Sequence, residues 1–198
     1  NGGAHKPSLV SIREGRKIVP MLRCVGYCDI QRSVLAPQYG HALETSNGQA
    51  VNTIANNVLW QYVIGLRLFQ RADVLNNALF GFWQPANFIM AMAPPEADVA
   101  SKELGISGMD CGKSLRIVGN VVSGGKGPCI GFNSFCIPPG HFANNSGHHC
   151  ELGFVVKGRV SQPIHDLTLW QIRFLAIWGY SKSDFPVVLN CRVADFAR

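Results

Sequence analysis

The chain is poor in charge. Asp, Glu, Lys and Arg together make up 15% of its 198 residues, against roughly 25% in a typical globular protein. The surface that faces water is therefore expected to be small or to be covered by partners, which suits a subunit of an assembly. Long apolar runs are missing too: no stretch of about 18 apolar residues occurs, so no membrane insertion is expected.

The sequence also lacks the features of an exported protein. Its first residues do not follow the basic, apolar and small-residue order of a signal peptide. Seven cysteines, an odd number without regular spacing, argue against a disulfide framework and predict reduced thiols in a cytosolic protein. On that view the single N-glycosylation triplet, Asn144-Asn145-Ser146, carries no weight, because such a triplet matters only in secreted proteins. The start at Asn1-Gly2-Gly3, without a methionine, suggests release from a longer precursor.

Apolar residues are plentiful, at 47% of the chain, and the length suits one domain with a sizeable core. No internal repeat or linker is recognised. Turn residues separate short stretches in which apolar and polar residues alternate, the pattern of half-buried strands. In 58–69 this alternation puts Trp60, Leu66 and Leu68 on one side. The predicted strands are Leu22–Ile30, Val58–Phe69, Ala78–Trp83, Phe88–Met92, Leu115–Val122, Ile130–Ile137, Cys150–Val160, Leu167–Trp178 and Val187–Phe196.

These strands predict an all-β fold, a single eight-stranded jelly-roll β-sandwich over residues 18–198. A parallel sheet is not expected, because parallel neighbours usually need a helix between them. The one convincing helix signal is Glu96–Leu104, which follows Pro94-Pro95 and ends before Gly105. It is expected to be a short connector of about two turns.

A basic arm, residues 1–17, is expected to precede the domain. The chain has a net charge of +6, and the arm contributes Lys6, Arg13, Arg16 and Lys17. Such a cluster can contact RNA phosphates without sequence specificity. An ordinary solvated terminus explains the same charges equally well. These four residues are the only site residues predicted, with no catalytic, cofactor-binding or metal-binding residue assigned.

A protease-like loop is the first of three features that suggest chemistry. Gly108-Met109-Asp110-Cys111-Gly112 resembles the nucleophile loop of chymotrypsin-like viral cysteine proteases, and His41 and Asp73 lie in a plausible order before it. However, 113–128 contains no histidine for a substrate pocket. A turn cysteine is therefore the favoured interpretation of Cys111.

The second feature is a partial phosphate-binding loop. Gly112-Lys113-Ser114 ends like one, but Ser107 stands where the pattern needs its first glycine. The segment that follows has a strand pattern, so no helix N-terminus is expected to hold a phosphate.

The third feature is a group of possible zinc ligands, Cys136, His141, His148, His149 and Cys150. Their spacing matches no compact zinc module. We expect loop histidines instead, which can titrate near neutral pH at a subunit contact.

The order of strands and loops resembles capsid jelly rolls of the picornavirus-like order. These end in a strand, a proline-bearing loop, a long strand, a turn and another long strand. The corresponding segments here are Ile130–Cys136, Ile137–Ser146, Cys150–Val160, Ser161–Asp166 and Leu167–Trp178. Two short matches, Ala143-Asn144 and Arg71-Ala72-Asp73, narrow the resemblance to the small coat protein of comovirus-type and fabavirus-type plant viruses.

This resemblance implies a structural capsid protein, not an enzyme, that is cut from a polyprotein and needs no cofactor. Its copies would gather about the fivefold axes of an icosahedral virion, beside a large coat protein and around single-stranded RNA. It would occur in virions and, during assembly, in the host cytoplasm. Two alternatives stay open: a viral cysteine protease with Cys111 as nucleophile, and a lectin-like ligand-binding β-sandwich.

Overall fold

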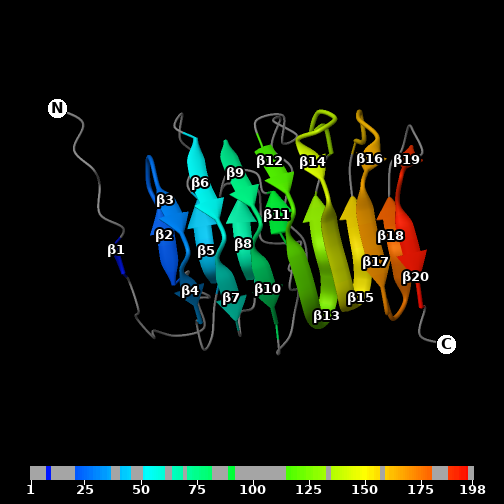
Figure 1. Cartoon of the computed structure of the whole chain (residues 1–198), viewed down its shortest axis with the longest axis horizontal. Helices are drawn as coiled ribbons and strands as arrows, with labels where there is room; N and C mark the ends of the chain where they lie inside the picture. Colours follow the sequence, from blue (N-terminus) through cyan, green and yellow to red (C-terminus); the bar gives the residue numbers. More distant parts are fainter. Residues whose placement is uncertain are drawn as a thin grey trace.

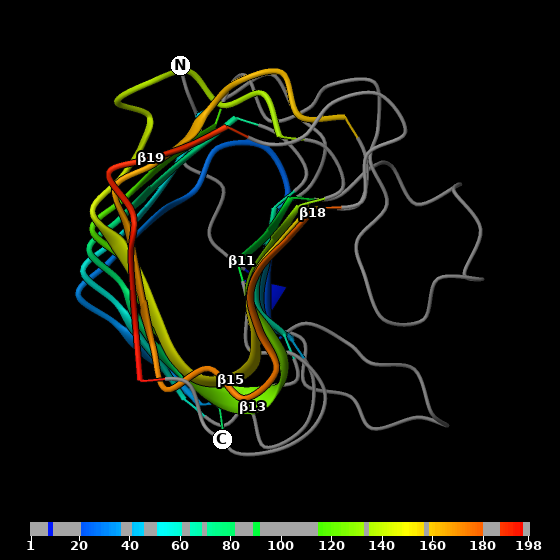
Figure 2. The same ribbon diagram turned by 90° about the vertical axis from the view of Figure 1, so that its right-hand side faces the viewer.

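The protein is a parallel β-solenoid in the computed structural model, in which the chain winds in successive coils about one axis. Figure 1 shows the coils following one another in sequence order from the N-terminal to the C-terminal end, and Figure 2 shows them superimposed when viewed along the axis. The structure describes residues 8–9, 21–36, 41–45, 51–60, 64–68, 71–81, 89–91, 115–132, 135–156, 159–179 and 187–195.

Each coil contributes strands to three faces. The first face contains β2 (Leu22–Cys24), β5 (His41–Thr45), β8 (Ile64–Leu68), β11 (Ile89–Ala91) and β18 (Leu175–Gly179), with the C-terminal parts of β13 (Val121–Phe132) and β15 (Asn145–Val156). The second face contains β3 (Asp29–Gln31), β6 (Asn52–Ala55), β9 (Ala72–Leu75), β12 (Leu115–Val118) and β14 (Phe142–Ala143), followed by the pair β16 (Ile164–His165) and β19 (Val188–Leu189). The third face contains β4 (Val34–Leu35), β7 (Val58–Trp60), β10 (Ala78–Phe80), β17 (Leu167–Trp170) and β20 (Arg192–Ala194), with the N-terminal parts of β13 and β15.

The predicted jelly-roll sandwich is therefore wrong, although the all-β class is right. The described strands pair in parallel, except that β1 (Ser8–Leu9) is antiparallel to β2. A solenoid joins parallel neighbours through the other faces of the coil, so it needs no connecting helix. No helix occurs among the described residues, and the predicted helix 96–104 lies outside them, as does almost all of the predicted arm 1–17.

Several predicted long strands are in fact two strands on different faces. The predicted strand 58–69 divides into β7 and β8, and 167–178 divides into β17 and β18. Alternation restarts after each bend, so Trp60 is 40% exposed whereas Leu66 is fully buried. The expectation that these two side chains share a side is wrong for this reason.

A sharp corner separates the second face from the third in each coil. The residue at the corner has positive φ and is usually Asn, which tolerates the left-handed conformation better than most residues. The corner residues are Arg32, Asn56, Asn76, Gly119, Asn144, Asp166 and Asn190. The backbone N–H groups of five of them bond the next coil, as from Asn56 to the carbonyl of Leu75 at 2.9 Å.

Four buried asparagines follow these corners and form a ladder inside the solenoid. They are Asn57, Asn77, Asn120 and Asn145, each 0–1% exposed. In each step one Oδ1 accepts hydrogen bonds from both the backbone N–H and the Nδ2 of the asparagine one coil earlier, at 3.0–3.1 Å. The ladder satisfies buried amides that would otherwise be costly, and it fixes the coils in register.

Aliphatic and aromatic side chains fill the rest of the interior. Inward positions of neighbouring strands stack on one another, as with Leu43 on Leu66 in the register of β5 and β8. Four phenylalanines, Phe132, Phe135, Phe142 and Phe154, pack mostly edge to face with ring centroids 5.2–6.0 Å apart. This is the core of the later coils.

Candidate functional site

A row of aromatic and polar side chains runs along the outside of the third face. Its members occupy equivalent positions in successive strands: Trp60, Phe80, Ser123, His148 and Trp170. We call this row the aromatic stripe. The preceding residue of each strand points inward and is buried, for example Leu59 and Leu169. Alternation along each strand therefore turns the stripe toward solvent.

The stripe follows the solenoid axis. Paired strands lie about 4.8 Å apart, so the four steps from Trp60 to Trp170 span about 19 Å. At one end the Trp60 and Phe80 rings meet edge to face, with centroids 6.3 Å apart. At the other end the His148 imidazole stacks on the Trp170 indole, with centroids 4.3 Å apart and planes inclined by 15°.

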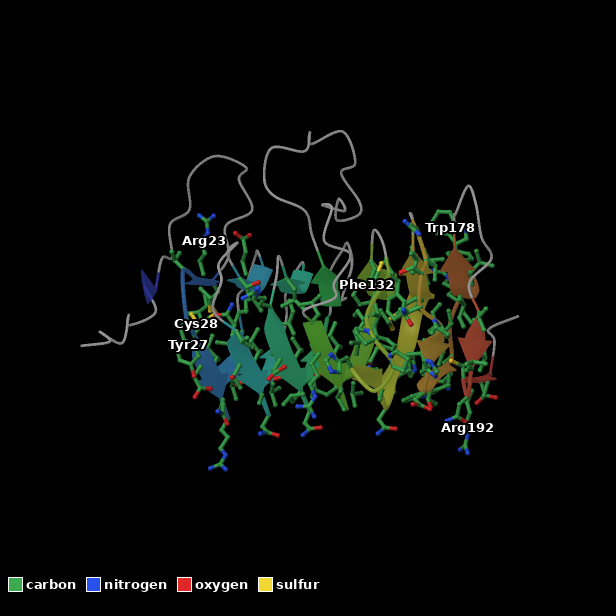
Figure 3. The ribbon with its side chains drawn as sticks, turned by 90° about the horizontal axis from the view of Figure 1, so that it is seen from above. Arg23, Tyr27, Cys28, Phe132, Trp178 and Arg192 are labelled. Atoms are coloured by element: carbon green, nitrogen blue, oxygen red, sulfur yellow. A yellow bond between two sulfur atoms is a disulfide. The ribbon has the colours of Figure 1, made fainter. Side chains whose placement is uncertain are left out.

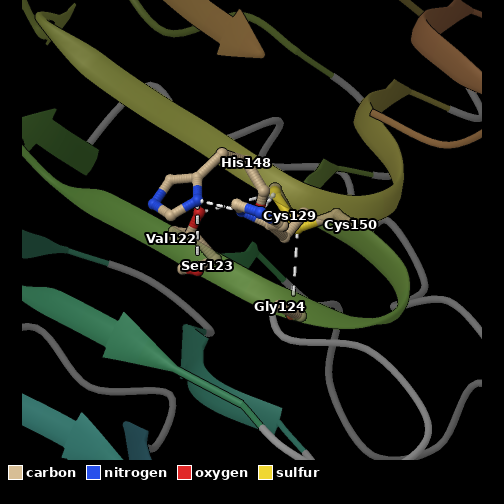
Figure 4. Close-up of a disulfide and its surroundings, with 7 residues drawn as sticks. Val122, Ser123, Gly124, Cys129, His148 and Cys150 are labelled. Atoms are coloured by element: carbon tan, nitrogen blue, oxygen red, sulfur yellow. Dashed lines mark hydrogen bonds between the residues drawn. A yellow bond between two sulfur atoms is a disulfide. The ribbon is translucent and has the colours of Figure 1, made fainter. Parts of the chain in front are cut away.

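His148 is the polar centre of the stripe. Its Nδ1 lies 3.2 Å from the Ser123 hydroxyl, as Figure 4 shows, and 2.6 Å from Nδ1 of His149. Burial, and secondarily the neighbouring His149, lower the pKa of His148. The imidazole is therefore held neutral near pH 7, when one ring nitrogen can donate a hydrogen bond and the other can accept one.

A second outward row lies beside the stripe, two residues closer to the corners. It runs from apolar to hydroxyl side chains and ends in a cation: Val34, Val58, Ala78, Val121, Ser146, Thr168 and Arg192. Arg192 alone is charged among the described members of the two rows. Figure 3 shows it projecting from the side opposite Arg23 and Trp178. Over its described outward rows, the third face is thus nearly uncharged.

A buried disulfide lies just beneath the stripe. Cys129 of β13 is bonded to Cys150 of β15, with an S–S distance of 1.97 Å, and joins two successive coils. Cys136 is also disulfide-bonded. The expectation of reduced thiols is therefore wrong, although Cys24, Cys28 and Cys191 are free. The sequence separation of 21 residues between Cys129 and Cys150 is close to one coil, and it is informative only once the coil is known.

The zinc hypothesis has no support among the described residues, which include no group of three or more potential ligands. Cys136 and Cys150 are both used in disulfides. His141 begins the approach to β14 on the second face, whereas His148 and His149 lie in β15 and not in a loop as expected.

The protease hypothesis also gains no site. His41 lies in β5 on the first face and Asp73 in β9 on the second, in separate sheets. Cys111 and the partial phosphate loop 112–114 lie outside the described residues. The predicted RNA contacts Lys6, Arg13, Arg16 and Lys17 lie outside them as well.

The outside of the first face carries an ion pair rather than an aromatic row. Arg23 Nε lies 3.2 Å from Glu44 Oε1, and the glutamate side chain is nearly buried while the arginine is largely exposed. Arg67 takes the next position in the register. The two faces are therefore chemically distinct.

An internal repeat was the signal that sequence analysis missed. The segments at the corners align as Ala55–Trp60, Leu75–Phe80, Val118–Ser123, Ala143–His148 and His165–Trp170. Each has the corner residue second, the residue after the corner third and the stripe residue last. Aligning these hexapeptides would have placed both the asparagine ladder and the stripe.

Comparison with known proteins identifies no relative. No family model, no curated protein and no solved structure matches the chain. Among the described residues, no helix is long and apolar enough to cross a lipid bilayer.

Proposed function

We propose that the chain is a glycan-binding protein whose aromatic stripe holds a neutral, extended polysaccharide along the solenoid axis. The observation that carries the proposal is the order of side chains in the stripe. Aromatic rings stand at both ends and hydrogen-bonding groups, Ser123 and His148, stand between them. A sugar ring has an apolar C–H face that packs on aromatic rings and hydroxyl edges that need hydrogen-bond partners.

The stripe is organised before any ligand arrives. Stacking on Trp170 and the contact with Ser123 fix the His148 ring in place. Side chains that are already ordered lose little conformational freedom on binding, so shallow contacts can still give useful affinity.

The charge of the face favours a neutral polymer. Apart from Arg192 at one end, the described outward residues of the two rows have no formal charge. A polyanion such as RNA would find one cation, whereas phosphate-binding surfaces use several.

The disulfides are consistent with this role. Structural disulfides persist mainly in oxidising compartments, such as the outside of the cell. We therefore propose such a compartment as its location, in place of the cytoplasm. There it would meet extracellular or cell-wall glycans. The proposal is for binding alone, since among the described residues His148 has no carboxylate partner that would orient it as a catalytic base.

The coat-protein hypothesis depended on a resemblance to jelly-roll proteins, and the fold is a β-solenoid instead. Its particle, its large coat protein partner and its RNA stay predictions that nothing described here supports. Electron microscopy of the purified chain, looking for particles with encapsidated RNA, would revive it.

Calorimetric titration tests the proposal, with soluble fragments of neutral glucan, xylan and mannan as probes and polygalacturonate and single-stranded RNA as charged comparisons. At least one neutral polymer is expected to bind, and Trp60→Ala with Trp170→Ala should weaken it by about tenfold or more. The matched control is Trp178→Ala on the first face, where the indole is 36% exposed against 40% for Trp60.

The proposal fails if the double variant binds as tightly as the parent chain. It also fails if no neutral glycan binds, or if RNA binds more tightly than every neutral polymer.

A further inference from the structure

The triplet Asn144-Asn145-Ser146 occupies the corner of one coil, and its residues have three separate environments. Asn144 is exposed at the corner with φ 53°. Asn145 is 1% exposed and belongs to the ladder. Ser146 is half-buried and belongs to the outward row beside the stripe, between Val121 and Thr168. We propose that Asn144 is an N-glycosylation site. This inference does not depend on the stripe or on its ligand.

The two neighbouring amides differ in their availability. Nδ2 of Asn145 donates to the Ile117 carbonyl at 2.8 Å, and its Oδ1 accepts from Asn120 at 3.1 Å. Among the described residues, the Asn144 amide has no hydrogen-bond partner. A glycan on Asn144 therefore breaks no hydrogen bond of the ladder. Asn145, whose amide the ladder needs, is buried and hydrogen-bonded.

The neighbouring corner residues leave Asn144 exposed. In the preceding coil the equivalent position is Gly119, whose side-chain position is taken by Oδ1 of Asn76 from one coil earlier. In the following coil it is Asp166, whose carboxylate is turned to the Asn190 amide. Along β15, Asn144 is four residues from His148, about 13 Å in an extended strand, so the glycan stands at the edge of the third face.

The disulfides reverse the argument that discounted this triplet. The triplet carries no weight only if the protein stays in a reducing compartment. Cys129–Cys150 and the second disulfide at Cys136 point to the compartment in which N-linked glycans are also added. An exposed acceptor and an oxidised core are independent observations, and both agree with modification.

Expression of the full chain behind a secretion signal in eukaryotic cells tests the inference. We expect one glycoform that peptide-N-glycosidase removes, leaving aspartate at position 144 in the peptide map. Asn144→Gly should abolish the modification and keep the corner, because Gly119 already serves at the same place. Ser146→Ala should also abolish it, and Ser146→Thr should retain it.

Asn56→Gly is the matched control, since it changes an exposed corner asparagine outside any acceptor triplet and should leave the glycan unchanged. Both secreted and cell-retained material is mapped, so that a variant that fails to leave the cell still gives a result. The inference is overturned if Asn144 is unmodified in disulfide-bonded parent protein and in Ser146→Thr. A glycan that persists in Asn144→Gly would overturn it as well.

Discussion

Asn77 and Asn120 are hydrogen-bonded through a single acceptor atom, Oδ1 of Asn120. The Oδ1 of Asn120 lies 3.0 Å from the backbone nitrogen of Asn77 and 3.0 Å from its Nδ2, so a single carbonyl accepts two hydrogen bonds from the previous coil. The same Nδ2 also donates a hydrogen bond to the Ile54 carbonyl oxygen, 2.8 Å away. Asn77 in turn accepts two hydrogen bonds from Asn57. The Asn77 side chain therefore links its own coil to the coil before it and to the coil after it.

Asn77→Ala is therefore expected to destabilise the protein strongly. It leaves the backbone N–H of Asn57, its Nδ2 and the Ile54 carbonyl without their partner inside the solenoid, and each unsatisfied buried group costs about 1–3 kcal/mol. We expect a loss of at least about 3 kcal/mol in the free energy of unfolding, measured by urea denaturation. Asn76→Gly, at the adjacent exposed corner, should change stability by less than about 1 kcal/mol. Equal losses in the two variants would show that the ladder is not the source of the stability.

The disulfide between Cys129 and Cys150 should stabilise the coils that it joins. It closes a segment of 21 residues, for which the entropic model gives about 3 kcal/mol. We expect Cys129→Ala with Cys150→Ala to lower the free energy of unfolding by about 2–4 kcal/mol, measured under non-reducing conditions. Cys191→Ala, which removes a free thiol near the last coil, is the control. A parent chain in which all seven cysteines react with a thiol reagent before unfolding would contradict the prediction.

Stability should fall as the solution is acidified through the range set by His148. Its pKa is lowered in the folded chain by burial and by His149, against about 6.5 in the unfolded chain. Below pH about 6.5 the unfolded state binds a proton more readily than the folded state, so the free energy of unfolding decreases until the folded-state pKa is also passed. His148→Phe keeps an aromatic ring on Trp170 and removes the titration.

Chemical denaturation at a series of pH values between 7 and about 4 measures this effect. The slope of stability against pH should be smaller in His148→Phe than in the parent chain. His141→Asn, a substitution of an exposed histidine before β14, should retain the parent slope. Identical slopes in His148→Phe and the parent would exclude His148 as the group responsible.

Local patterns located some of the strands, missed β5, β6 and β9, and predicted the arrangement wrongly. At the start of the strand predicted over 22–30, Leu22 and Cys24 are buried and Arg23 between them is largely exposed, as alternation requires. Period-two alternation, however, is the same in a sandwich and in a solenoid, because it reports only that one side of a strand is buried. The corners decide between them, and the pairs Asn56-Asn57 and Asn76-Asn77 each begin with a corner residue of positive φ.

The candidate site was harder to predict from the sequence than the strands were. His148 and His149 were singled out as residues that titrate at a contact, but the contact of His148 with Ser123 and Trp170 joins three different coils. No spacing within one strand reveals such a neighbour. Such a neighbour becomes predictable when the coils are aligned by their ladder asparagines. Asn57 is 20 residues from Asn77, and Asn120 is 25 residues from Asn145.

The corners fix how successive coils align, whatever the length of chain between two corners. Asn77 and Asn120 are 43 residues apart, about twice the interval between Asn57 and Asn77, yet their amides still meet at 3.0 Å. A longer segment can therefore connect two corners without changing the register of the coils that follow. By the same logic, a whole coil is the natural unit by which this protein can gain or lose length.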